Sequence, residues 1–159
     1  MQPSSELERG LTKDTSKVDL AEVRNRAVLA ARAAAAKVGL ETMVLEVGAV
    51  LAITDYFVIT SAANARQVRA IAEEVEARLA ESAGVKPLRI EGLDDARWVL
   101  LDYGDFVVHV FLEEVRRYYD IERLWSDSPT VEWQDESEVE TRDHDTRDHD
   151  AQGRPVLAP

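Results

Sequence analysis

The sequence predicts a single α/β domain in which helices pack on a mixed five-stranded sheet. Three observations lead to this fold class. Apolar residues recur at helical spacing in three segments, β-formers cluster in five short segments, and these segments follow one another in the order α-β-β-α-β-β-β-α. The chain of 159 residues has room for one domain of this kind, and two independent cores are not expected.

The first predicted helix begins near Asp19. The run "DLAE" places Asp19 as the N-cap and Glu22 at the capping-box position, and Gly39 follows the Ala-rich run as a stop. The second predicted helix lies between Asn64, its N-cap, and Gly84, its C-terminal stop. One apolar stripe runs along the first helix, formed by Val23, Ala27, Ala30, Ala31, Ala34 and Val38.

Five strands are predicted around the second helix. "TMVLEV" (42–47) and "DYFVIT" (55–60) precede it, and "PLRIEG" (87–92) follows it as a short third strand. The stretch "RWVLLDYGDFVVHVF" (97–111) is typical of a hairpin of two more strands. A last helical segment (113–125) is expected to place apolar residues in or near the core, namely Val115, Tyr118, Tyr119, Ile121, Leu124 and Trp125.

The hairpin is the segment in which apolar and ionisable residues alternate. If Tyr103 and Gly104 form a two-residue loop, Trp98 lies opposite His109. One face of the hairpin is then wholly apolar and belongs to the core, formed by Val99, Leu101, Phe106, Val108 and Val110. The other face is a mixed surface, formed by Trp98, Leu100, Asp102, Asp105, Val107 and His109.

Two Asp and one His on a surface also occur in metal sites and acid/base pairs. Strand geometry, however, places His109 about 13 Å from the turn that carries Asp102 and Asp105, so these side chains cannot share one metal ion. We therefore expect the Asp side chains to bind turn amides and His109 to pack against Trp98. No catalytic residue, metal ligand or cofactor is predicted. The absence of cysteine also excludes disulfides, thiolate zinc sites and a cysteine nucleophile.

The net charge of −12 argues against nucleic-acid binding by phosphate neutralisation. Residues 126–159 carry ten Asp and Glu against three Arg, and they contain the repeat "TRDHD" twice. We expect residues 1–17 to be a disordered extension, 18–126 the folded domain and 127–159 a disordered acidic tail. Because no apolar run has the length of a membrane span or the form of a signal peptide, we expect a cytoplasmic protein that does not bind membranes.

Several separate motifs agree with one known family. "ITDYFVITSAANARQVRAIAEEVEARL", "RIEG", "RWVLLDYGDFVVHVF" and "RRYYDIERLW", in this order and at this spacing, resemble the ribosomal silencing factor family of bacterial type, also called Iojap-like. The resemblance covers about residues 19–126. It implies a fold related to nucleotidyltransferases without their active site. The sequence agrees, since it contains neither a Gly-Ser phosphate loop nor a paired Asp-x-Asp on a strand.

The resemblance also implies a function. Members of the family bind a protein on the subunit-joining face of the large ribosomal subunit, keep the small subunit from docking and so repress translation under nutrient limitation. They are often dimeric when free, and the resemblance implies neither enzyme activity nor a cofactor. Two alternatives stay open. One is a nucleotidyltransferase-like enzyme with Asp102 or Asp55 as metal ligand, and the other is an adaptor for a non-ribosomal protein.

We expect the partner to dock on the hairpin face that carries Trp98, because interface energy is concentrated in a few aromatic and Arg anchors. The mildly acidic body suits a basic partner protein. The alternative is that the terminal helix covers Trp98, with Tyr118 or Tyr119 packed over it, which would make Trp98 part of the core. The candidate partner-binding residues are Trp98, Asp102, His109, Glu91, Tyr103, Arg116 and Tyr119.

Overall fold

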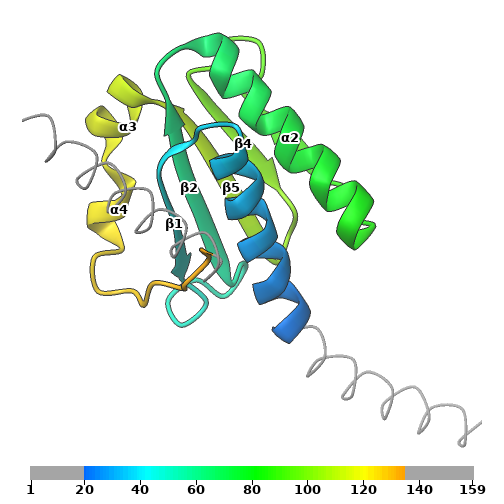
Figure 1. Cartoon of the computed structure of the whole chain (residues 1–159). Coiled ribbons are helices and arrows are strands. Elements are labelled where there is room, and N and C mark those ends of the chain that lie inside the picture. The colour runs from blue at the N-terminus through cyan, green and yellow to red at the C-terminus, as the bar shows by residue number, and fades with distance from the viewer. Residues whose placement is uncertain (1–19, 135–159) are drawn as a thin grey trace, which may run out of the picture.

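Five strands form one mixed sheet in the computed structural model, which describes residues 20–134. The sheet order is β1-β2-β5-β4-β3 (Figure 1). Strands β2 and β5 are parallel, and the other neighbouring pairs are antiparallel. The strands are β1 (Leu40–Glu46), β2 (Tyr56–Ala62), β3 (Arg89–Glu91), β4 (Trp98–Asp102) and β5 (Phe106–Leu112). The predicted α/β class and the five-stranded mixed sheet are confirmed.

Two helices cover one face of this sheet and enclose the main core. They are the first helix (residues 20–36, blue in Figure 1) and α2 (Ala65–Ala83). Helix α2 has the predicted ends, since the Asn64 side chain accepts the N–H of Gln67 at 2.9 Å and Gly84 adopts a φ of 66°. The predicted N-cap Asp19 lies outside the described residues. The first helix buries alanines completely, namely Ala27, Ala30, Ala31, Ala33 and Ala34.

The opposite face of the sheet is covered by two short helices, α3 (Glu113–Tyr119) and α4 (Ile121–Leu124). The sequence predicts one helical segment here, but the segment breaks at Asp120, whose φ of 46° is left-handed and ends α3. Tyr118, Leu124 and Tyr119 are exposed by 81%, 79% and 53%. All three were expected in or near the core. The expectation was wrong for Tyr118 and Leu124, whereas Tyr119 still packs against Trp98 with a centroid distance of 5.0 Å.

The hairpin of β4 and β5 has a different register from the predicted one. Its two loop residues are Gly104 and Asp105, and Trp98 consequently lies opposite Phe111 instead of His109. The first loop position favours glycine because it needs a positive φ, and Gly104 adopts 87°. The strand partners shift by two residues, which is the side-chain period of a strand. The predicted division into an apolar face and a mixed face is therefore retained.

The folded part continues past the predicted boundary at residue 126. Residues 129–133 run along the outer edge of β1, where Thr130 pairs with Leu45 in an antiparallel bridge. Val131 is only 6% exposed and packs into the main core. The domain therefore reaches at least to Trp133, which packs against the same core. The rest of the expected tail and the expected extension (1–17) lie outside the described residues.

Among residues 20–134, no helix combines the length and the apolar composition that crossing a membrane requires.

Candidate functional site

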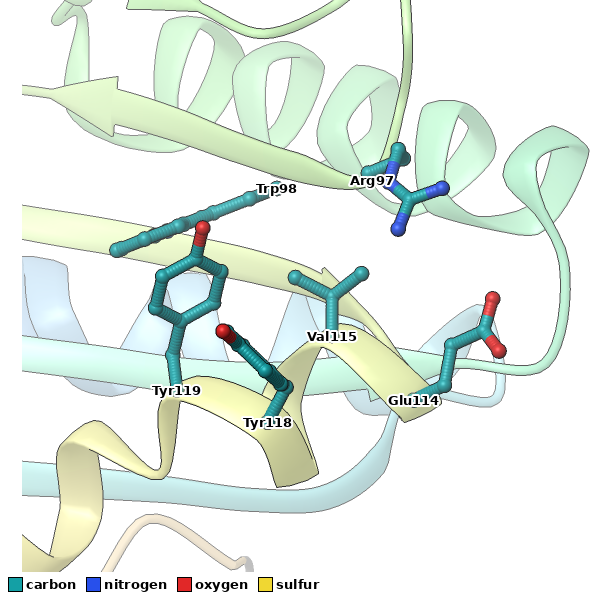
Figure 2. A pocket seen from close by; sticks show the side chains of 6 residues that line it. All are labelled: Arg97, Trp98, Glu114, Val115, Tyr118 and Tyr119. Atoms are coloured by element: carbon teal, nitrogen blue, oxygen red, sulfur yellow. The ribbon is translucent and has the colours of Figure 1, made fainter.

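A pocket of about 430 Å³ opens between the start of β4 and helix α3 (Figure 2). Helix α3 contributes two pairs of residues that are four apart and so lie on one side of the helix. Aromatic rings form one part of the wall, and Arg97 and Glu114 lie together at the other side. We call this hollow the Trp98 pocket; it is lined by Arg97, Trp98, Glu114, Val115, Tyr118 and Tyr119.

Trp98 is half-buried in the wall of this pocket. Its ring stacks on Phe111 with a centroid distance of 4.8 Å, and its centroid lies 5.0 Å from that of Tyr119. The alternative, in which the terminal helix packs Tyr118 or Tyr119 over Trp98, is thus met in part, by Tyr119. The pocket nevertheless leaves part of the indole accessible, so Trp98 is available to a partner without being a free surface side chain.

His109 lies beneath this surface and is 5% exposed. Burial lowers the pKa of its imidazole to about 4, so the ring is neutral at pH 7. The indole Nε1 of Trp98 donates a hydrogen bond to Nδ1 of His109 at 3.1 Å, which places the imidazole proton on Nε2. Phe57 packs edge-on against the imidazole at 4.7 Å. His109 packs on Trp98 as expected, and it is buried beneath the surface on which Trp98 lies.

Asp102 has the turn-binding role that the sequence suggests. Its Oδ1 accepts the N–H of Gly104 at 2.8 Å, and its Oδ2 accepts a hydrogen bond from Arg89 Nε at 3.1 Å. Glu91 lies on the neighbouring strand with 61% of its side chain exposed. Because Glu91 pairs with Leu100, and Arg89 with Asp102, these carboxylates share the sheet face of Trp98. They lie along that face without lining the Trp98 pocket.

Tyr103 faces the other side of the molecule. Its ring stacks on Phe106 at 4.7 Å with an interplanar angle of 6°, and it packs against the main core. Burial raises the pKa of its hydroxyl group. Tyr103 therefore lies on a different face from Trp98, although the sequence placed both in one candidate set.

Arg116 is a buried cross-link instead of a surface anchor, with an exposure of 5%. Its Nη1 donates to the carbonyl oxygen of Leu40 and to Ser61 Oγ, both at 3.0 Å. Its Nη2 donates to the carbonyl oxygen of Glu41 at 2.8 Å, and its Nε donates to Glu122 Oε1 at 2.7 Å. The guanidinium group thus fastens α3 and α4 to β1 and β2.

Arg97 and Glu114 were not predicted from the sequence as site residues, and Tyr118 was predicted only in or near the core. One signal was available, because Glu114 and Tyr118 are four residues apart in a helical segment that also carries Tyr119. That spacing does not show which strand the helix faces. Within residues 20–134, no three His, Asp or Glu side chains come together in a group that could hold a metal ion.

Comparison with known proteins places the chain in a family. A family model described as "Ribosomal silencing factor during starvation" matches residues 20–155. A "Ribosomal silencing factor RsfS" from Halalkalibacterium halodurans is 44% identical over 92 residues, which cover 58% of this chain and 78% of that protein. A crystal structure of a Chromobacterium violaceum protein matches with a TM-score of 0.63 and 36% identity, covering 65% of this chain and 86% of that chain. A mouse protein named "Mitochondrial assembly of ribosomal large subunit protein 1" is 32% identical over 85 residues, which cover 52% of this chain and 37% of that protein. The chain therefore belongs to the ribosomal silencing factor family.

Proposed function

We propose that this protein binds the large ribosomal subunit through a ribosomal protein on its inter-subunit face. Binding there blocks association of the two subunits and represses translation under nutrient limitation. The family match and the name of the mouse relative, which refers to the large ribosomal subunit, support a role at that subunit. We also propose that the free protein is a homodimer and that it catalyses no reaction.

The Trp98 pocket is the observation that carries the proposed docking site. Tyr118 and Tyr119 expose 81% and 53% of their surface, and they line the same pocket as Trp98. Exposed aromatic side chains around a hollow are typical of protein interfaces, where Trp and Tyr supply much of the binding energy. We assign the direct contacts to these three aromatic residues, and a supporting role to the buried His109 and Arg116.

Acidic side chains extend the proposed surface along the sheet. Glu91 and Asp102 share the face of Trp98, where Arg89 lies 4.0 Å from the first and 3.1 Å from the second. Glu114 lies in the pocket wall with Arg97, so the carboxylates of this surface exceed its guanidinium groups by one. Negative charge at the rim of an interface mainly increases the association rate with a basic partner and determines which partner is accepted. We therefore propose a basic surface on the ribosomal protein, with recovery on large subunits that decreases as the salt concentration rises.

Co-sedimentation with purified ribosomal particles tests this function. We expect the protein to pellet with isolated large subunits and to be depleted from joined ribosomes. The variant Tyr118→Ala should weaken binding about tenfold or more, as expected for an interface anchor, because it removes an exposed ring. Its melting temperature should stay unchanged, since Tyr118 contributes little to the core.

Leu124→Ala is the matched control for this experiment. Leu124 is 79% exposed, almost as much as Tyr118, but it lies on α4 and does not line the Trp98 pocket. Its truncation should leave binding unchanged. Equal recovery on isolated large subunits and on joined ribosomes would contradict the anti-joining mechanism. Equal losses for the two variants would contradict the assignment of the pocket.

A further inference from the structure

The outer edge of β1 is occupied by a segment of the same chain that the docking function does not use. We call residues 129–133 the edge segment. The N–H of Glu46 donates to the carbonyl oxygen of Pro129, and the N–H of Val131 donates to the carbonyl oxygen of Val44, both at 2.9 Å. These two bonds flank the bridge between Leu45 and Thr130 and have the antiparallel pattern. The edge segment therefore acts as a sixth, very short strand.

The side chains of the edge segment fit two receiving positions. Val131 is 6% exposed and enters the main core, and Trp133 packs against that core. The indole Nε1 of Trp133 donates to the carbonyl oxygen of Thr42 at 3.1 Å. From the first helix, Arg32 Nε donates to the carbonyl oxygen of Trp133 at 2.8 Å. The edge of β1 thus holds a valine and a tryptophan two residues apart, together with the backbone that joins them.

The residue between these two positions makes a different contribution. Glu132 is exposed, as is Thr130, because side chains of an extended segment alternate between the two sides. Recognition therefore depends on Val131, Trp133 and the backbone. The pattern Val-x-Trp in extended conformation is what the edge of β1 accepts.

An edge strand without a partner exposes a row of N–H and C=O groups that pair readily with another strand. We propose that the edge of β1 is a docking site for an extended Val-x-Trp segment, filled by the chain's own residues and open to the same segment of a second copy. Each copy that releases its edge segment offers both a free edge and a matching strand, so two such copies are complementary. Residues 125–128 connect the segment to α4 and contain no helix or strand.

A peptide-binding experiment on the full-length protein tests this inference independently of any ribosomal function. A fluorescein-labelled peptide of residues 126–135, "SDSPTVEWQD", stands in for the segment of a second copy. In the full-length variant Val131→Asp, a carboxylate replaces the buried valine and displaces the internal segment. We expect this variant to bind the peptide at least tenfold more tightly than the wild type does, because in the wild type the internal segment competes at high effective concentration. Fluorescence anisotropy measures both affinities.

The controls separate strand recognition from nonspecific adhesion. A peptide with Glu132→Gln should bind the variant as well as the parent peptide does, since Glu132 is exposed. Peptides with Val131→Asp or Trp133→Ala should not bind. If full-length Val131→Asp is unfolded by circular dichroism, full-length Trp133→Ala serves as the second acceptor, because it loses only the outer part of the segment. A folded acceptor that binds no peptide, or that binds all four peptides alike, overturns the inference.

Discussion

Trp98 and His109 are joined by a hydrogen bond of 3.1 Å between the indole Nε1 and the imidazole Nδ1, although they are not opposite each other in the hairpin. The acceptor nitrogen is the one that gains a proton when the imidazole becomes charged, because Nε2 already carries the other proton. Protonation of His109 therefore removes the bond that orients Trp98. The protonation state of the buried His109 is thereby coupled to the orientation of Trp98 in the wall of the Trp98 pocket.

The first prediction concerns acid. The pKa of His109 is about 4 in the folded protein and 6.5 in the unfolded chain, so the unfolded chain binds the extra proton between these values. The His109 contribution to stability is therefore present above pH 6.5 and decreases as the pH falls toward 4, by about 3 kcal/mol in total. The free energy of unfolding of the variant His109→Leu should therefore decrease less than that of the wild type as the pH falls from 6.5 to 4. Urea unfolding at several pH values measures it, and identical pH dependence in both proteins would contradict the prediction.

The second prediction concerns Gly92, whose φ is 85°. A Cβ atom at this position would collide with the carbonyl oxygen of Trp98, whereas a Cβ at Gly84 would meet no atom within 4 Å. Gly84→Ala therefore carries only the left-handed backbone cost of about 1 kcal/mol. Gly92→Ala should lose roughly 2 kcal/mol more, the usual cost of overpacking, because the start of β4 must move. Chemical denaturation of the two variants tests this difference, and equal losses would show that no collision occurs.

The third prediction concerns the buried cross-link made by Arg116. Arg116→Met should lower the free energy of unfolding by about 3 kcal/mol, because it leaves strand carbonyl groups and the Glu122 carboxylate without their donor. Arg116→Lys should recover only part of this loss, since an ammonium group lacks the planar fork of donors. Arg117→Met, at the exposed neighbouring position, should be nearly neutral. Thermal melting ranks the variants, and similar losses at positions 116 and 117 would refute the cross-link.

The fourth prediction uses two truncated chains. A chain that ends after Gln134 should melt close to the full-length protein, because residues 135–159 contain few apolar side chains to bury. A chain that ends after Ser128 lacks Val131 and Trp133, and its melting temperature should fall by at least about 10 °C. Differential scanning calorimetry compares the two chains. A similar melting temperature for both would mean that the edge segment contributes nothing to stability.

Local chemistry explains which parts of the fold could be predicted. Asn64 and Gly84 are a good N-cap and a good C-terminal stop in any context, so both ends of α2 follow from the sequence. The break at Asp120 is accompanied by a distant contact, because Arg116, which donates to Glu122 across the break, also donates to the carbonyl oxygen of Leu40 on β1. No local window of sequence contains Leu40 together with Arg116.

For the candidate site, the sequence predicts only which residues of the hairpin share a face of the sheet. Alternation assigns Trp98 and His109 to one face, but it does not show how much of that face a later helix covers. His109 therefore looked like a surface residue and is buried. The segment "PTVEW" did carry a signal, since a β-branched and an aromatic residue alternate with polar ones, but the acidic residues around it obscured that signal.

The two faces of the sheet differ in the substitutions that they tolerate, because alanines of the first helix cover one of them. Because five alanines there are completely buried, the helix backbone lies close to the strands, and a larger side chain at any of them would push the helix away. On the other face, large rings surround an open hollow, and a ring of different size at Tyr118 has solvent to extend into. Descendants of this sequence with altered partner preference should therefore arise through changes in α3, while the alanine-lined side keeps its shape.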